Sequence, residues 1–197
     1  MVGARVVHVV SQWSFYAAHP GQIPAIWNGG LSSFGGLLFA LPTGLVLMRR
    51  RCPGVSLGRG LDLAAPVLAA GWAMGRLLGP QLMISGGGRP TTAWYGMRYA
   101  GSAGPRVPVP IFQSIGAFLV LAAVLLVERR MHQRPDGLLI AVAAALWGAC
   151  RFLDQFLWLG TPGRIDAVEV AGLLLSLIGW MALGSLLLHP RSDVPAG

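Results

Sequence analysis

The sequence predicts an all-α integral membrane protein, a polytopic bundle of helices. Hydrophobic residues make up 54% of the 197 residues, charged residues only 11%, and the mean hydropathy is +0.63. A soluble domain normally carries about 25% charged residues, so this composition excludes an ordinary soluble protein. The apolar residues also gather in runs long enough to cross the roughly 30 Å hydrocarbon layer of a bilayer. We therefore expect one integral membrane domain at residues 1–190, followed by a tail at 191–197.

Five full transmembrane helices are expected, because each apolar run is close to the ~20 residues that a spanning helix needs. The runs cover residues 30–48, 63–84, 110–127, 138–159 and 167–188. A shorter apolar segment at residues 2–15 is interpreted as a partial N-terminal helix whose beginning is missing. This segment lacks the charged start and the cleavage site of a signal peptide. No repeat of 20–50 residues is visible, which favours a single domain.

Basic residues predict the orientation. All fifteen are arginine, they give a net charge of +8, and most lie in short segments between apolar runs. The positive-inside rule places the two densest clusters in the cytoplasm. These clusters are Arg49, Arg50, Arg51 and Arg59, then Arg129, Arg130 and Arg134. The loops 85–109 and 160–166 then face outward and the C-terminus is cytoplasmic. Because topology explains the positive charge, we expect no nucleic-acid partner.

Two arginines, Arg76 and Arg151, lie inside runs that are otherwise typical of lipid-embedded helix. A charge near the bilayer centre costs about 2.5–3.5 kcal/mol on insertion scales, so an intramembrane arginine is a functional-site hypothesis. Both lie about two turns from the outer end of their spans, which favours a shared, outward-opening pocket for an anion. The alternatives are a structural ion pair between Arg76 and Asp154, a contact with helix-end carbonyls, or side chains that extend to the membrane surface.

Cysteine and histidine show no metal-binding or disulfide pattern. Cys52 follows an arginine run and Cys150 lies within a predicted helix, so we expect two free thiols. Three of the histidines, His8, His132 and His189, are scattered along the chain and support no metal site. We expect no metal and no cofactor.

Several motifs resemble, in the same order, those of the bacterial prolipoprotein diacylglyceryl transferase family. The first of them are Tyr-Ala-Ala-His-Pro at residues 16–20 and Ile-Trp-Asn-Gly-Gly-Leu-Ser-Ser-Phe-Gly-Gly at 26–36. Asp62 at a helix start, Gly75-Arg76, Gly79 and Gly88-Arg89-Pro90-Thr91 resemble the central arginine motif of the family. The run Gly148-Ala149-Cys150-Arg151-Phe152 resembles a later arginine helix, and Ser176 falls in a matching place in the last span. The resemblance covers almost the whole chain.

The resemblance implies a seven-helix fold in the bacterial inner membrane, with the C-terminus in the cytoplasm. The chain starts partway along the second helix of that fold, so either the gene is shortened or the start codon is placed too far downstream. The implied activity is transfer of a diacylglyceryl group from phosphatidylglycerol to a cysteine thiol, with release of glycerol phosphate. The implied partners are therefore phosphatidylglycerol, the membrane and the signal peptide of a lipoprotein precursor.

Arg76 and Arg151 match the arginines to which the family implies a catalytic role. A guanidinium binds phosphate oxygens through two parallel hydrogen bonds, remains charged in an apolar setting, and stabilises the phosphate as its C–O bond breaks. The expected lipid-binding residues are Arg76, Arg151, Arg89, Gly29, Gly30, Gly35, Gly36 and Gln113. For the glycines the alternative is close helix packing.

The groups expected for proton transfer depart from the family pattern. Phe34 stands where the family has a histidine thought to act as the base, and Gln155 replaces a glutamate, although Asp154 lies beside it. Two routes around the missing base remain: positive charge lowers the pKa of a thiol below ~8.5, or His19 reaches the site. Three hypotheses stay open, namely an active transferase, a catalytically inactive lipid-binding or scaffold paralogue, and a transferase with a different acceptor.

Overall fold

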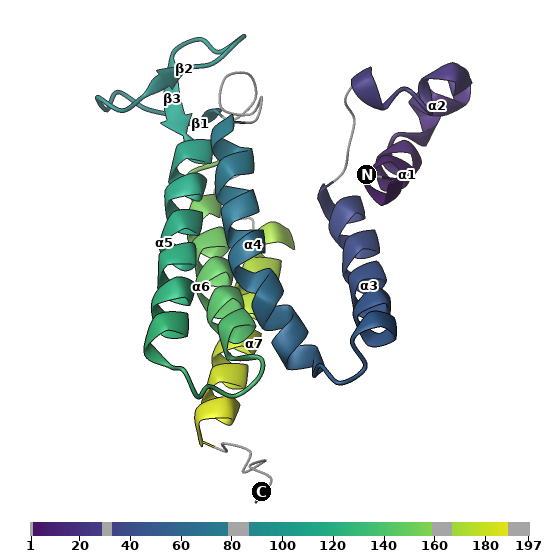
Figure 1. Ribbon diagram of the computed structural model, residues 1–197. Helices are drawn as coiled ribbons and strands as arrows, with labels where there is room; N and C mark the ends of the chain where they lie inside the picture. Colours follow the sequence, from purple (N-terminus) through teal and green to yellow (C-terminus); the bar gives the residue numbers. More distant parts are fainter. Residues whose placement is uncertain (1, 29–32, 79–86, 159–166, 189–197) are drawn as a thin grey trace, which may run out of the picture. The chain divides into compact units, whose positions relative to one another are not determined.

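The computed structural model describes residues 2–28, 33–78, 87–158 and 167–188, and these residues are mostly helical (Figure 1). They belong to two units, Met1–Ser56 and Leu57–Gly197, and each is described by itself. Four helices of the second unit are long and apolar enough to cross a membrane. They are α4 (Leu57–Leu78), α5 (Val109–Arg130), α6 (Leu138–Gln155) and α7 (Ala167–Leu188). The predicted polytopic all-α membrane fold is therefore confirmed.

Four of the five predicted spans correspond to these helices, with shifted ends. Helix α4 starts earlier than the predicted span 63–84, and α5 extends beyond 110–127 at both ends. The ends of two predicted spans, at 79–84 and 159, and the tail at 191–197 lie outside the described residues. The predicted span 30–48 coincides with helix α3 (Ser33–Arg51), which is not among the four candidate spans, so its crossing of the membrane stays a prediction. The single-domain organisation also stays a prediction.

The first unit is organised around a buried arginine. Arg5 donates hydrogen bonds to the backbone carbonyl oxygens of Ile23 (2.9 Å), Gln22 (2.6 Å) and Ala25 (3.2 Å). Its guanidinium also lies over the Tyr16 ring, 5.2 Å from the centroid. Arg5 therefore ties the first helix to the turns that follow. The elements of this unit before α3 are α1 (Val2–Ser11), α2 (Trp13–Ala18) and two 3-10 turns, η1 (Pro20–Gln22) and η2 (Ile26–Asn28). The predicted helical segment 2–15 is thus divided between α1 and α2.

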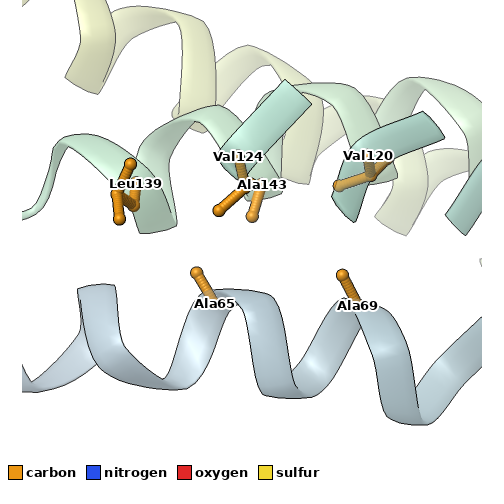
Figure 2. Packing of buried hydrophobic residues seen from close by; sticks show 6 residues of the cluster. All are labelled: Ala65, Ala69, Val120, Val124, Leu139 and Ala143. Atoms are coloured by element: carbon orange, nitrogen blue, oxygen red, sulfur yellow. The ribbon is translucent and has the colours of Figure 1, made fainter. Parts of the chain in front are cut away.

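The core of the second unit lies between α4, α5 and α6 (Figure 2). Small side chains on α4 face branched and small side chains on the other two helices, which lets the three backbones approach closely. The buried cluster consists of Ala65, Ala69, Val120, Val124, Leu139 and Ala143. Large apolar side chains such as Leu63, Leu119 and Met181 are instead exposed. In a membrane protein these outward side chains meet lipid rather than water.

Helices α6 and α7 pack with their backbones in contact. A Cβ atom added to Gly148 would lie 2.5 Å from the backbone nitrogen of Ser176, and one added to Gly179 would overlap the backbone nitrogen of Ala145. The Ser176 hydroxyl donates a 2.9 Å hydrogen bond to the Ala145 carbonyl oxygen. Small residues with interhelical hydrogen bonds are a common way to join membrane helices. The described contacts of Gly148 and Ser176 are therefore packing contacts.

A buried carboxylate on α4 caps the start of α6. Asp62 accepts hydrogen bonds from the backbone N–H of Gly137 (2.9 Å, to Oδ2) and of Ile140 (3.0 Å, to Oδ1). Gly137 has a φ of +93°, a conformation that glycine adopts without strain. The first N–H groups of a helix have no partner within the helix, and the helix dipole favours a negative charge there. Asp62 therefore fixes the register of α4 against α6.

Replacing Asp62 with alanine is expected to lower the free energy of unfolding by about 2–4 kcal/mol, because two partly buried N–H groups lose their acceptor. Denaturant titration of the purified protein in detergent micelles measures this loss. Asp136→Ala is the matched control, because that carboxylate is half-exposed and its ion pair with Arg59 is 3.7 Å long. An equal loss for both variants would contradict the capping role.

The predicted outer loop 85–109 contains a small antiparallel sheet that the sequence analysis did not predict. Its strands are β1 (Gly87–Pro90), β2 (Met97–Arg98) and β3 (Pro105–Pro108), in the order β1-β3-β2. The sheet adjoins the end of α6, since the backbone N–H of Arg89 donates a 2.9 Å hydrogen bond to the Leu157 carbonyl oxygen. The loop is thus a structured cap at the end of α6 opposite Asp62.

Candidate functional site

The structure brings Arg76 and Arg151 together around one aromatic ring. Arg76 is on α4 and Arg151 on α6, and both guanidinium groups lie over the indole of Trp72. The distance from Cζ to the ring centroid is 4.5 Å for Arg76 and 5.9 Å for Arg151. Both residues are partly buried. The two arginines singled out from the sequence therefore share one environment.

The register fixed by Asp62 explains why the two arginines meet. Asp62 binds the N–H of Gly137. Arg76 is fourteen residues after Asp62 on α4, and Arg151 is fourteen residues after Gly137 on α6. Helices α4 and α6 run in the same direction (Figure 1), and each residue rises about 1.5 Å, so both arginines lie about 21 Å from the cap. Trp72 and Trp147 are likewise at matching positions, and their rings meet edge to face at 5.1 Å and 89°.

Asp154 completes a charged cluster with the two arginines. Its Oδ2 lies 3.5 Å from Nη1 of Arg151, and both side chains are 12% exposed. The sequence analysis considered an ion pair between Asp154 and Arg76 as an alternative; the structure shows an ion pair between Asp154 and Arg151. Arg76 lies close enough to interact electrostatically with both of them. Two guanidinium groups and one carboxylate leave this cluster of Arg76, Arg151 and Asp154 with one net positive charge.

The cluster retains hydrogen-bonding capacity. Nη1 of Arg151 is buried, and its 3.5 Å ion pair with Asp154 is not a hydrogen bond, so within the described part of the chain it has no hydrogen-bond partner. A buried donor without a partner costs roughly 1–3 kcal/mol, so such a group favours a ligand that accepts its hydrogen bond. The oxygen atoms of an anion provide such acceptors.

Gln113 on α5 is another buried residue whose polar atoms lack hydrogen-bond partners in the described part of the chain. Its residue is 2% exposed, and neither Nε2 nor Oε1 has a partner among the described residues. A Cβ on Gly116 would lie 3.3 Å from Sγ of Cys150, and one on Gly88 would contact both Val109 and the Leu157 carbonyl. These contacts pair α5 with α6 in antiparallel register. In that register Gly116 on α5 is opposite Cys150 on α6. Gln113 is about one helical turn before Gly116, and Asp154 is about one turn after Cys150, so the two residues are at the same level of the bundle.

Arg89, a predicted lipid-binding residue, has a structural contact. Its side chain on β1 is exposed, and its Nε donates a 3.0 Å hydrogen bond to the Trp158 carbonyl oxygen. Side chain and backbone of Arg89 therefore both bind carbonyls at the end of α6. These carbonyls would otherwise lack partners. A contact between Arg89 and lipid stays a prediction.

The predicted glycine residues are not part of the described cluster. Gly29 and Gly30 lie outside the described residues, and Gly35 and Gly36 belong to α3 in the first unit. A Cβ on Gly36 would lie 3.9 Å from the Cβ of Ala4, an ordinary packing distance between α3 and α1. Their proposed contact with a lipid headgroup stays a prediction.

His19 has a local role in the structure. Its ring stacks on Phe15 with centroids 4.8 Å apart, and its Nδ1 lies 3.2 Å from the Phe15 carbonyl oxygen. Both cysteines are free thiols, as predicted. Over the described ranges, no group of three or more histidine, cysteine, aspartate or glutamate residues is placed to hold a metal ion.

Trp72 and Trp147 are the site residues that the sequence analysis missed. The signal was present, because each intramembrane arginine follows a tryptophan by four residues, in Trp72-x-x-x-Arg76 and Trp147-x-x-x-Arg151. Residues four apart lie on the same face of a helix. Tryptophan in a membrane protein is most often an anchor at the membrane surface, so its presence alone does not indicate a site residue.

Comparison with known proteins gives one consistent family. The family model of prolipoprotein diacylglyceryl transferase matches residues 1–188. Three curated relatives carry the name phosphatidylglycerol–prolipoprotein diacylglyceryl transferase. The protein from Geobacter sulfurreducens is 31% identical over 160 residues, 79% of this chain and 59% of the relative. The one from Streptococcus agalactiae is 29% identical over 189 residues, 89% of this chain and 67% of the relative.

The match to the Bacillus velezensis protein covers fewer residues but has a higher sequence identity than the other two. It is 42% identical over 76 residues, which cover 39% of this chain and 27% of that protein. The chain thus spans between about a quarter and two thirds of the length of these relatives.

Proposed function

The chain belongs to the prolipoprotein diacylglyceryl transferase family, and on this basis we propose that it binds phosphatidylglycerol at Arg76 and Arg151 and transfers its diacylglyceryl group. The acceptor is the cysteine thiol of a lipoprotein precursor, whose signal peptide also contacts the protein. The observation that carries the proposal is the shared position of the two guanidinium groups over Trp72.

Charge supports a phosphodiester as the ligand. The cluster of Arg76, Arg151 and Asp154 has one net positive charge, and the phosphate of phosphatidylglycerol has one negative charge. Their combination is neutral, which suits a site within an apolar bundle, where an uncompensated charge is costly. Nη1 of Arg151, which is ion-paired with Asp154 but donates no hydrogen bond among the described residues, gains a hydrogen-bond acceptor in the same step.

The proposed reaction needs a leaving phosphate that the protein stabilises. The thiolate sulfur attacks the terminal glycerol carbon of the diacylglyceryl group, a C–S bond forms, and the C–O bond to phosphate breaks. The bonding electron pair leaves with the oxygen, giving glycerol phosphate, whose growing charge the guanidinium groups stabilise. The thiol releases its proton to water before attack, and the two guanidinium groups nearby favour the thiolate.

Gln113 suits the neutral part of the lipid headgroup. A primary amide donates and accepts hydrogen bonds, and a hydroxyl group does the same. The headgroup of phosphatidylglycerol ends in such hydroxyl groups. We therefore assign Gln113 to the terminal glycerol, while the arginines bind the phosphate.

The distribution of arginine supports the proposed membrane orientation. Arg129 and Arg130 end α5, and Arg59 and Arg134 lie near the same end of the bundle as Asp62. The positive-inside rule places this end in the cytoplasm, which puts the arginine cluster, about 21 Å away, toward the outer leaflet. In a bacterium this is the outer leaflet of the inner membrane, and the last turn of α7 is then cytoplasmic.

A transfer assay tests this function. The purified full chain in nanodiscs that contain phosphatidylglycerol is mixed with a peptide bearing the precursor cysteine. We expect a diacylglyceryl thioether product by mass spectrometry and equimolar glycerol phosphate. Nanodiscs with phosphatidylethanolamine as the only phospholipid, and a peptide with serine at the cysteine, are the controls expected to give no product. Absence of product with the complete substrates would overturn the transferase proposal.

Lipid binding without transfer is the second candidate, and Phe34 favours it because phenylalanine cannot accept a proton. The engagement of Asp154 by Arg151 also leaves that carboxylate poorly placed to act as a free base. In this case, phosphatidylglycerol binds but no thioether forms, even in the variant Phe34→His. Product only with a different thiol substrate would instead support a changed acceptor.

A further inference from the structure

Trp72 lies close to both cations of the proposed lipid site and belongs to none of the motifs that resemble the family. Its indole ring lies under both guanidinium groups, with the ring centroid 4.5 Å from Cζ of Arg76 and 5.9 Å from Cζ of Arg151. The two guanidinium groups repel each other, especially where water is scarce. An attractive interaction must therefore offset this repulsion and keep them close together. Asp154 pairs with Arg151 and also attracts Arg76, and the Trp72 ring offers both cations a second point of attraction.

We propose that Trp72 is a positioning residue that holds Arg76 and Arg151 at the spacing required to bind one lipid phosphate. This inference rests on the proposed lipid-binding function and adds a residue to it. The face of an indole ring carries negative electrostatic potential and attracts a cation within about 6 Å, and tryptophan does so more strongly than tyrosine or phenylalanine. A single ring between two helices therefore attracts both arginines toward one point.

The surrounding contacts hold the ring itself in place. Trp147 on α6 meets Trp72 edge to face, with the centroids 5.1 Å apart, a preferred geometry for aromatic pairs. The next residue on α4, Ala73, accepts a 2.9 Å hydrogen bond from the Ser114 hydroxyl on α5. The backbone beside Trp72 is thus tied to α5 while its ring is fixed by α6.

The two tryptophans share the Trp-x-x-x-Arg spacing but have different roles. Each tryptophan lies one turn below the arginine of its own helix, but only Trp72 is recorded beneath both cations in the described residues. Trp147 contacts Trp72 and supports it from α6. Loss of Trp72 should therefore weaken lipid binding through both arginines, whereas Trp147 acts through Trp72.

Fluorinated tryptophans at position 72 provide the sharpest test, because added fluorine weakens the potential of the ring face while leaving its size nearly unchanged. The full chain with site-specifically incorporated mono-, di-, tri- or tetrafluorotryptophan is placed in phosphatidylcholine nanodiscs with increasing phosphatidylglycerol. Native mass spectrometry counts bound phosphatidylglycerol. We expect affinity to fall stepwise with each fluorine, by about tenfold over the series.

Conventional variants and a matched control complete the test. Trp72→Phe should keep part of the affinity and Trp72→Leu should lose more, while the fluorinated series excludes simple loss of packing. The same fluorination at Trp94, which is 95% exposed, should leave affinity unchanged. Equal affinity across the Trp72 series in a protein that binds phosphatidylglycerol would overturn the positioning role. A wild-type protein that binds no phosphatidylglycerol would instead overturn the proposed function beneath it.

Discussion

Arg151→Gln is expected to reduce diacylglyceryl transfer, as kcat/KM for phosphatidylglycerol, by about 10²–10³-fold. The side chain is largely buried and paired with Asp154 at 3.5 Å. Its removal takes away a phosphate donor, and it leaves Arg76 and Asp154 with no net charge to attract the lipid. The loss is measured with the thioether assay at several mole fractions of phosphatidylglycerol.

A double variant separates charge from geometry. Arg151→Gln combined with Asp154→Asn restores one net positive charge, carried by Arg76, so phosphatidylglycerol binding should recover while transfer stays low. Arg130→Gln at the end of α5 is the matched control, because that side chain is exposed outside the cluster. Normal transfer in Arg151→Gln would show that the buried arginine serves only the fold.

Gly179→Ala is expected to cause the largest loss of stability, about 3 kcal/mol or more, because the added Cβ meets the backbone of Ala145 rather than a side chain that can rotate. Backbone atoms can give way only if α6 and α7 separate, which also disturbs the Ser176 hydrogen bond. Denaturant titration in detergent measures the change.

Gly184→Ala on the same helix is the control for Gly179→Ala. No atom lies within 4 Å of a Cβ at that position, so the substitution should be neutral or stabilise the helix by about 0.5–1 kcal/mol. Equal stability of the two variants would contradict the backbone contact between α6 and α7.

The sequence predicted the helices and the arginine pair because both follow from the cost of placing polar groups in lipid. Apolar length located α4 to α7, and the same cost singled out Arg76 and Arg151. The role of Asp62 was not predictable in this way, because its hydrogen bonds join residues 75 and 78 positions apart. Only the three-dimensional register shows that this carboxylate caps another helix.

Two other features escaped prediction for physical reasons. The strands β1 and β3 are short and contain proline or glycine, residues that weaken the signal for a strand. Trp72 was missed because tryptophan in a membrane protein is most often assigned to the lipid surface. The four-residue spacing to each arginine carried the relevant information, and it becomes meaningful once the two helices are known to be adjacent.

The Asp62 cap also has a consequence for biosynthesis. Helix α4 leaves the ribosome before its partner α6, and the Gly137 N–H that Asp62 binds is made 75 residues later. At about 5–20 residues per second, this interval lasts about 4–15 s. During that time the helix has an acidic group near one end and Arg76 near the other, both without the partners that α6 supplies. Newly made α4 must therefore remain where water or the insertion machinery can solvate these charges until α6 has been synthesised.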